Sequence, residues 1–196
     1  MQRVAAGRSH TAFIDARHIG KVDAGGARLA VEHLVETGRT RIAMVNGPTQ
    51  NAAAQNRAAG TVEALAEAGL ELVGGTPLSG DWSEHWGREA AALLLRRGLE
   101  FDAVFAASDQ IARGVADALR ESSKRIPQDV AVVGVDNWDV MVAASRPPLT
   151  TVDLNLAQIG HRAADILLDI VGGQPVEPGV RLVPCTLVKR ESSALS

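Results

Sequence analysis

The stretch Val130-Ala131-Val132-Val133-Gly134-Val135-Asp136-Asn137 places six uncharged residues before two polar ones. An apolar run of this length, rich in β-branched residues, is typical of a strand that is buried on both faces. Such strands occur in parallel sheets that helices cover on both sides, and ligands bind beyond the carboxyl ends of these strands. Asp136 and Asn137 stand at that end. The stretch therefore predicts the class of fold and the edge of the sheet where a site would lie.

The same pattern recurs toward the N-terminus. The run Arg41–Val45 stops at Asn46-Gly47-Pro48, and the run Ala103–Ala107 stops at Ser108-Asp109. Weaker strands are expected near 71–78 and 180–188. Apolar residues at helical spacing predict helices between the strands, over about 23–38, 58–69, 83–97, 111–119 and 155–170. We expect Asp23, Ser83 and Asn155 to cap three of these helices and Gly38 to end the first.

Strands that alternate with helices in this way predict βαβ units with right-handed crossovers, and hence an α/β fold. The segment Arg146–Thr151 contains two consecutive prolines, which exclude helix there, and it is the clearest boundary in the chain. A length of 196 residues suits one domain or two small lobes.

Composition and charge exclude several classes of function. The formal net charge of −3 is unlike that of a domain that binds nucleic acid by itself, so we expect no DNA binding from these residues alone. Cys185 is the only cysteine, which excludes a disulfide within the chain and favours a reducing compartment. No apolar run approaches the roughly 20 residues of a membrane span, and the start of the chain lacks the apolar stretch of a signal peptide. We expect a cytoplasmic protein without a membrane partner.

Parallel strands would bring Asn46, Ser108-Asp109 and Asp136 to one edge, where their donors and acceptors suit a polyhydroxylated ligand. Each also has a purely structural interpretation. Ser108 or Asp109 can simply cap the helix that follows, and Asp136 can close a turn. Pattern alone favours a solvated surface position for Arg57. Trp82, in the loop Gly80–Ser83, is as well suited to covering the edge of a core as to stacking on a sugar ring.

Catalytic motifs are absent from the sequence. There is no G-x-S-x-G elbow, no G-x-x-x-x-G-K-[ST] loop and no G-x-G-x-x-G after a strand. The five histidines do not have metal-ligand spacing, and Cys185, in a late strand, is expected to be a buried inert thiol. We therefore expect neither an enzyme nor a cofactor or metal site.

From Asp23 to Leu187 the chain resembles the effector-binding part of the LacI/GalR family of transcriptional regulators. The segments that carry the resemblance are Gly26–Leu34, Arg41–Ala43, Gly47-Pro48, Arg57–Gly60, Asp102–Gln110, Ile126–Asn137 and Arg146–Val152.

The resemblance implies the periplasmic-binding-protein type I fold, in which two doubly wound parallel-sheet lobes enclose a ligand between them. Residues 22–152 and 183–190 would form the C-terminal lobe, and 1–21 and 155–182 a remnant of an incomplete N-terminal lobe. The N-terminus would then be truncated, and the helix-turn-helix that binds DNA in the family would be absent.

Site residues follow from the same resemblance. Arg57 and Asp136 match family residues that bind sugar hydroxyls, and Trp82 matches a residue that packs on the sugar. Ser108 occupies a position that is often Asn, with Asp109 beside it. Leucines at 154 and 156 replace a polar and an aromatic contact found in a family member, which argues against a galactoside.

The function implied is a carbohydrate-sensing module of a regulator, in which effector binding shifts the lobes and so controls operator affinity. The expected partners are a small carbohydrate, operator DNA only through the missing N-terminal domain, and a second copy in a homodimer. The alternative is a sugar-binding protein of a transport system, which would require export. An enzyme on a doubly wound fold is a third hypothesis. The coding sequence upstream of Met1 would separate the first two.

Overall fold

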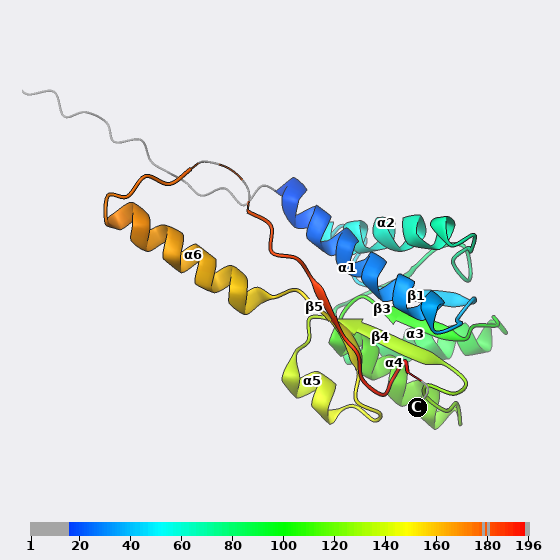
Figure 1. Cartoon of the computed structure of the whole chain (residues 1–196). Coiled ribbons are helices and arrows are strands. Elements are labelled where there is room, and N and C mark those ends of the chain that lie inside the picture. The colour runs from blue at the N-terminus through cyan, green and yellow to red at the C-terminus, as the bar shows by residue number, and fades with distance from the viewer. Residues whose placement is uncertain (1–15, 178, 180, 195–196) are drawn as a thin grey trace, which may run out of the picture.

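The apolar runs of the sequence become the central strands of one mixed sheet. The computed structural model describes residues 16–177, 179 and 181–194, and in these residues six strands form a sheet with helices on both faces (Figure 1). The strands are β1 Ile42–Asn46, β2 Leu78–Ser79, β3 Ala103–Ala106, β4 Ala131–Val135, β5 Thr150–Asp153 and β6 Thr186–Val188. The helices are α1 Ala16–Glu36, α2 Ala52–Glu67, α3 Glu84–Arg96, α4 Asp109–Glu121, α5 Asp139–Ala144 and α6 Leu156–Val171.

The strand order is β2-β1-β3-β4-β5-β6, and every neighbouring pair is parallel except β5 and β6. Phe105 of β3 pairs with Met44 of β1 on one side and with Val133 of β4 on the other, so the carboxyl ends of these strands lie at one edge. The prediction of an α/β fold with a mainly parallel sheet is confirmed.

Successive residues of the central strands pack into two separate cores. Met44 and Phe105 contact the helices α1 and α2, whereas Val45 and Val104 contact α3 and α4 on the opposite face. All five residues of β4 are buried. This alternation follows from the period of two in a strand, and both cores hold the carboxyl edge of the sheet in place.

Helix boundaries agree with the sequence at some ends. Ser83 and Ser108 each cap a helix through the side-chain oxygen, which accepts from the backbone N–H of Trp86 (3.1 Å) and Ile111 (3.2 Å). Gly38, with φ +85°, adopts the left-handed conformation just after α1.

Two predicted caps are wrong. Asp23 does not begin a helix, because α1 already starts at Ala16 and a tertiary ion pair with Arg57 decides the environment of this carboxylate. Asn155 precedes α6 with φ +53°, but its side-chain amide donates to the Pro184 carbonyl and leaves the helix uncapped.

The weaker strand predictions hold only in part. The stretch expected near 71–78 forms the two-residue strand β2, and that near 180–188 forms the three-residue strand β6. Pairing to an existing neighbour, rather than the apolar pattern, sets the length of both strands. Residues 1–15, which the family resemblance assigns to the remnant of an N-terminal lobe, fall outside the described residues. The short helix α5 was not predicted.

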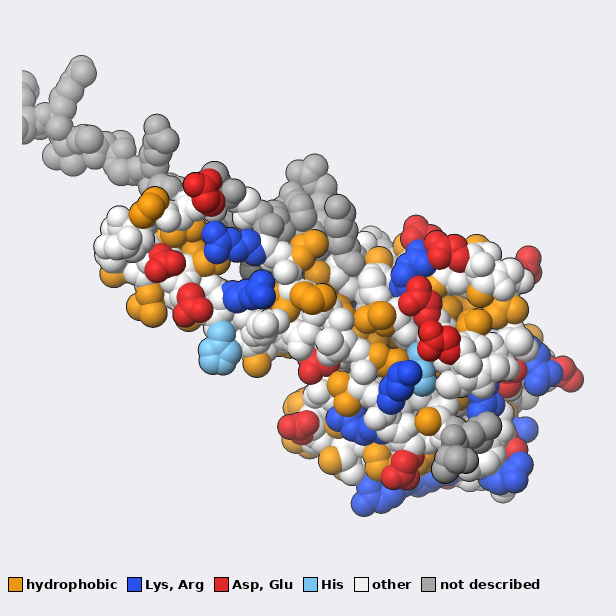
Figure 2. Space-filling view, viewed as in Figure 1, with side chains coloured by type: hydrophobic (Ala, Val, Ile, Leu, Met, Phe, Trp, Pro, Cys, Tyr) orange, Lys and Arg blue, Asp and Glu red, His pale blue; other side chains and the backbone are white. Residues whose placement is uncertain are grey.

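Helix α6 projects from the sheet into solvent (Figure 1). None of its residues is buried, and Leu168 and Val171 are 68% and 78% exposed. Figure 2 shows apolar side chains over this part of the surface. The assignment of 155–182 to a separate lobe remains a prediction. Among the described helices, none is both long and apolar enough to cross a membrane.

Candidate functional site

Polar residues that follow three parallel strands meet at one edge, as the sequence predicts. Asn46 ends β1, Ser108 follows β3 and Asp136 follows β4. Beside them lies a cavity of about 260 Å³. It is lined by Asn51, Ala53, Arg57, Trp82, Ser108, Gln110 and Asp136. Four of the five predicted site residues thus share one cavity.

Arg57 is 6% exposed, so its interpretation as a solvated surface residue is wrong. Its guanidinium forms an ion pair with the Asp23 carboxylate at 2.9 Å and lies 3.9 Å from the Asp136 carboxylate. It also donates to the carbonyl oxygen of Ala107, the residue that follows β3. One cation and two carboxylates therefore converge near the carboxyl edge of the sheet. Hydrogen bonds to Asp23 and Ala107 fix the orientation of the guanidinium.

Asp23 is a member of this cluster that sequence reasoning assigned to helix capping. Its burial raises the pKa of the carboxyl group, and the adjacent Arg57 opposes that rise. The burial of Asp23 could have been inferred from the small residues Ala24–Ala27 that follow it, because small residues allow two helices to cross closely. A Cβ atom at Gly60 would lie 2.4 Å from the Ala24 carbonyl oxygen, so α1 and α2 nearly touch at that point. An acid beside such a contact is buried and needs a cation.

Trp82 packs on the hydrophobic cores and also lines the cavity. The half-buried indole packs against both cores, and its ring centroid lies 5.8 Å from the Arg57 guanidinium carbon. This is a cation–π distance. Gly47 allows the ring to approach, since a Cβ atom there would lie 2.3 Å from the indole. The same side chain covers the core edge and forms an apolar wall of the cavity.

Asp136 has a backbone φ of +113°, a strained value for a residue other than glycine. Its side chain is 37% exposed, which leaves the carboxylate accessible from the cavity. Burial raises the pKa of this carboxyl group to about 6, with the Arg57 charge acting in the opposite direction. Asp136 closes the turn after β4 and also presents an acceptor to the cavity.

Asp109 is fully buried behind the cavity wall. Its carboxyl group accepts from the Thr151 hydroxyl at 2.6 Å and from the backbone N–H of Trp138 at 2.8 Å. Burial raises its pKa to about 7. Asp109 therefore fixes the loop that carries Asp136, while its neighbour Ser108 caps α4 and lines the cavity.

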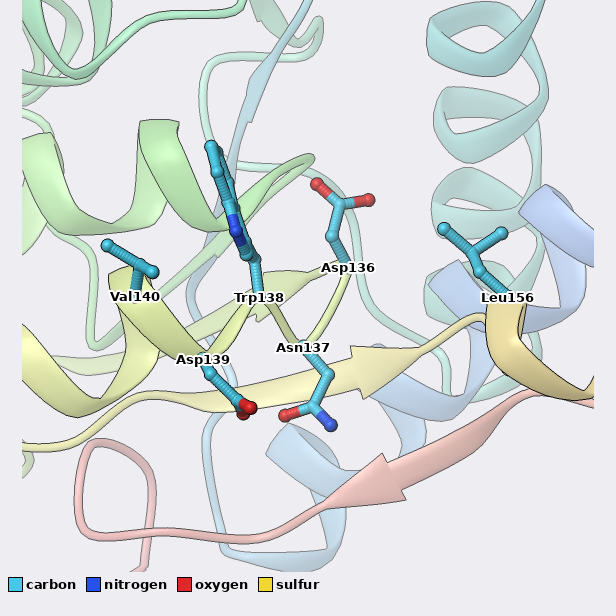
Figure 3. A pocket seen from close by; sticks show the side chains of 6 residues that line it. All are labelled: Asp136, Asn137, Trp138, Asp139, Val140 and Leu156. Atoms are coloured by element: carbon cyan, nitrogen blue, oxygen red, sulfur yellow. The ribbon is translucent and has the colours of Figure 1, made fainter.

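A second cavity, of about 600 Å³, adjoins the first and shares Asp136 with it (Figure 3). It lies between the loop after β4 and the start of α6. Its lining consists of Asp136, Asn137, Trp138, Asp139, Val140 and Leu156. Sequence reasoning did not select Trp138, although an indole two residues after Asp136 was a signal for a wall beside the site.

Cys185 lies just before β6 and is half-buried, and burial raises the pKa of its thiol above the ordinary value. Its thiol contacts the Val22 carbonyl oxygen at 3.5 Å. Within the described residues, no group of three or more His, Cys, Asp or Glu side chains is arranged to hold a metal ion.

An open, mainly parallel α/β sheet with a polar cavity at its carboxyl edge defines a class of domains that bind small ligands. A family model, that of the periplasmic binding protein-like domain, matches residues 31–193. The chain belongs to this family, in the form found in transcriptional regulators of the LacI type.

Known relatives are regulators. The HTH-type transcriptional regulator CelR of Thermobifida fusca is 42% identical over 169 residues, which are 86% of this chain and 49% of CelR. The lac repressor dimer bound to operator and the anti-inducer ONPF aligns with a TM-score of 0.79 at 34% identity, covering 88% of this chain and 51% of that one. The complex of CelR with cellobiose aligns with a TM-score of 0.77 at 39% identity, covering 87% and 52%. The chain spans about half the length of the curated relatives it matches.

Proposed function

We propose that this chain is the effector-binding part of a LacI-type transcriptional regulator and that it senses a small carbohydrate. The observation that carries the proposal is the cluster of Arg57, Asp136 and Trp82 around one cavity. A buried guanidinium donates to sugar hydroxyls, an accessible carboxylate accepts from them, and an indole packs on the apolar face of a ring.

Relatives support this assignment. One regulator of known structure is described in complex with cellobiose, and another in complex with operator as a dimer. In the intact regulator, effector binding would favour one arrangement of the lobes and thereby change operator affinity. Because this chain has a net charge of −3, we assign operator contacts to another part of the regulator. The regulator acts in the cytoplasm as a homodimer, and the site binds its ligand without turnover.

The direct test is isothermal titration calorimetry of the 196-residue chain with glucose, galactose, cellobiose and lactose. Each hydrogen bond to a charged group contributes roughly 1.5–3 kcal/mol. Replacing Arg57 with Ala should therefore weaken the affinity for the preferred sugar about tenfold to a hundredfold.

Removal of Arg57 also leaves the Asp23 carboxylate without its cation, so a second variant is needed. Asp136→Asn changes a partly exposed carboxylate and should weaken binding without unfolding the lobe. Arg41→Ala is the matched control, because Arg41 is about half exposed and pairs with the exposed Glu100. Unchanged affinity in both Arg57→Ala and Asp136→Asn would refute the assignment.

A further inference from the structure

Trp138 occupies a position where its side chain does not cap the helix that follows. It is the N-cap residue of α5, yet it makes no side-chain capping bond. Ser, Thr, Asp or Asn would stabilise the helix there. The indole is instead 48% exposed. A large apolar side chain that makes no capping bond and keeps about half of its surface exposed is better explained by what it contacts in a complex.

The loop that carries this indole is held by a set of partly buried hydrogen bonds. The Asp109 carboxylate accepts from the backbone N–H of Trp138, and the backbone N–H of Asp136 donates to the Val152 carbonyl oxygen at 2.8 Å. Between them, the Asn137 side-chain amide donates to Asp153 at 3.0 Å and its oxygen accepts from Arg190 at 2.8 Å. Both Asp136 and Asn137 have positive φ angles, of 113° and 52°. The surrounding structure thus fixes a strained loop.

The side chains of this loop point to two opposite sides. Figure 3 shows Asp136, Trp138 and Leu156 pointing to the same side of the loop, whereas Asn137 and Asp139 point to the other. The pinned Asn137 therefore determines on which side its neighbours lie. Leu156, the first residue of α6, is 62% exposed and faces the same cavity.

The two cavities differ in chemistry and share one residue. The smaller contains Arg57, Ser108 and Gln110, whereas the larger has an apolar wall of Trp138, Val140 and Leu156. Asp136 lines both. A volume of about 260 Å³ lies below the range of about 300–1,000 Å³ that is usual for ligand sites, so a ligand larger than this cavity would extend into the adjoining one through their shared residue Asp136.

We propose that Trp138, with Val140 and Leu156, forms a second subsite, which binds the second ring of a disaccharide whose first ring occupies the cavity of Arg57 and Asp136. This proposal rests on the function proposed above and narrows its ligand to sugars of two rings. The C–H groups on one face of a pyranose are apolar and pack on an indole, while the hydroxyls at the ring edge remain in solvent or reach Asp136. In this arrangement Trp138 makes the site bind two-ring sugars more tightly than one-ring sugars.

The test compares disaccharides with their single rings on the full chain. Affinities for cellobiose, lactose, glucose and galactose are measured by saturation-transfer difference NMR, which also reports which ring contacts the protein. We expect the preferred disaccharide to bind about tenfold tighter than its monosaccharide. Trp138→Ala should remove that difference and leave monosaccharide affinity within about twofold, and Trp138→Phe should retain part of it. Val62→Ala is the control, because Val62 is exposed to the same extent, at 49%, and lines neither cavity.

The outcomes separate the two proposals. Loss of disaccharide preference in Trp138→Ala, with saturation of both rings in the wild type, would support the subsite. Equal affinity for one-ring and two-ring sugars, or a preference that survives Trp138→Ala, would overturn the subsite and leave the sugar-binding function standing. If none of the four sugars binds the wild-type chain, the proposed function fails and the subsite fails with it.

Discussion

At the residue scale, Asp109 links the fold to the site. Its carboxyl group is fully buried, and its direct donors are a neutral hydroxyl and a backbone N–H. Asp136 and Arg190 are the charged groups that act on it, in opposite directions. Desolvation prevails and raises the pKa from 3.8 to about 7, so the folded protein holds a proton there that the unfolded chain releases.

This shift has a defined effect on stability. Because the folded state binds the proton more tightly, the contribution of Asp109 is full below about pH 4 and is lost as the pH rises toward 7. Wild-type stability should fall by up to about 1.4 kcal/mol per pH unit relative to Asp109→Asn, in which the amide mimics the protonated acid. Urea unfolding at pH 4.5, 6 and 8 measures the difference. Asp81→Asn, at an exposed site, should follow the wild type, and parallel curves for wild type and Asp109→Asn would contradict the account.

Residues at the ends of central strands were predictable, and residues placed by packing were not. Asp136 follows from strand order and from the family resemblance, because parallel strands must end together, whereas Arg57, inside α2, follows from the resemblance alone. Asp23 was assigned a local role, since nothing in its sequence neighbourhood identifies an arginine 34 positions away as its partner. Trp138 lies in a segment with no clear helical pattern, and its exposure depends on the backbone angles of Asp136 and Asn137.

At the element scale, the contact between α3 and α4 depends on two glycines. A Cβ atom at Gly87 would lie 2.2 Å from the Ile111 carbonyl oxygen, and one at Gly114 would lie 2.0 Å from the Glu84 carbonyl oxygen. Each glycine therefore faces the backbone of the other helix, which cannot move aside like a side chain. Intrinsic helix propensity favours alanine at both positions, and the close crossing outweighs it.

We expect Gly114→Ala to destabilise the protein by about 1–3 kcal/mol, because the two helices must separate. The matched control is Gly160→Ala in α6, where nothing lies within 4 Å of the added Cβ atom. That substitution should stabilise α6 by up to about 1 kcal/mol. Thermal unfolding followed by circular dichroism distinguishes the two, and a gain in stability from Gly114→Ala would show that the crossing is looser than described.

Long elements were predictable from the pattern, whereas short ones were not. Helices α3, α4 and α6 have clear apolar faces, and the central strands have continuous apolar runs. Strands β2 and β6 have two and three residues, and each exists because a neighbour offers free hydrogen-bonding groups. Helix α5 has six residues, of which only Val142 is buried, so it carries almost no amphipathic signal.

At the scale of the whole molecule, the sheet and its covering helices are held by two buried cores, whereas α6 is not. The helix has a strong apolar face, but none of its residues is buried. A 16-residue helix with no buried residue is marginal in water. The predicted division, with 155–182 outside the lobe of 22–152, is consistent with this arrangement and remains a proposal.

Hydrogen exchange on the purified chain tests that difference. Amides of α6 should exchange much faster than those of α2, a helix of the same 16-residue length that packs on the sheet through Ala54, Ala64 and Leu65. Mass spectrometry of deuterated peptides resolves the two helices. Equally slow exchange in both, in a chain shown to be monomeric by sedimentation, would mean that α6 is folded by contacts other than those described.

The antiparallel pairing of β5 with β6 has an evolutionary consequence. Asp153 pairs with Thr186, so the chain departs toward α6 and comes back at adjacent points of the sheet. A segment whose two ends are neighbours can be lengthened, exchanged or lost by a single genetic event while the rest of the backbone keeps its path. The segment after Asp153 can therefore change during evolution while the cluster of Arg57 and Asp136 is preserved. Because Leu156 in this segment lines the larger cavity, such a change replaces one wall of that cavity and can alter ligand specificity.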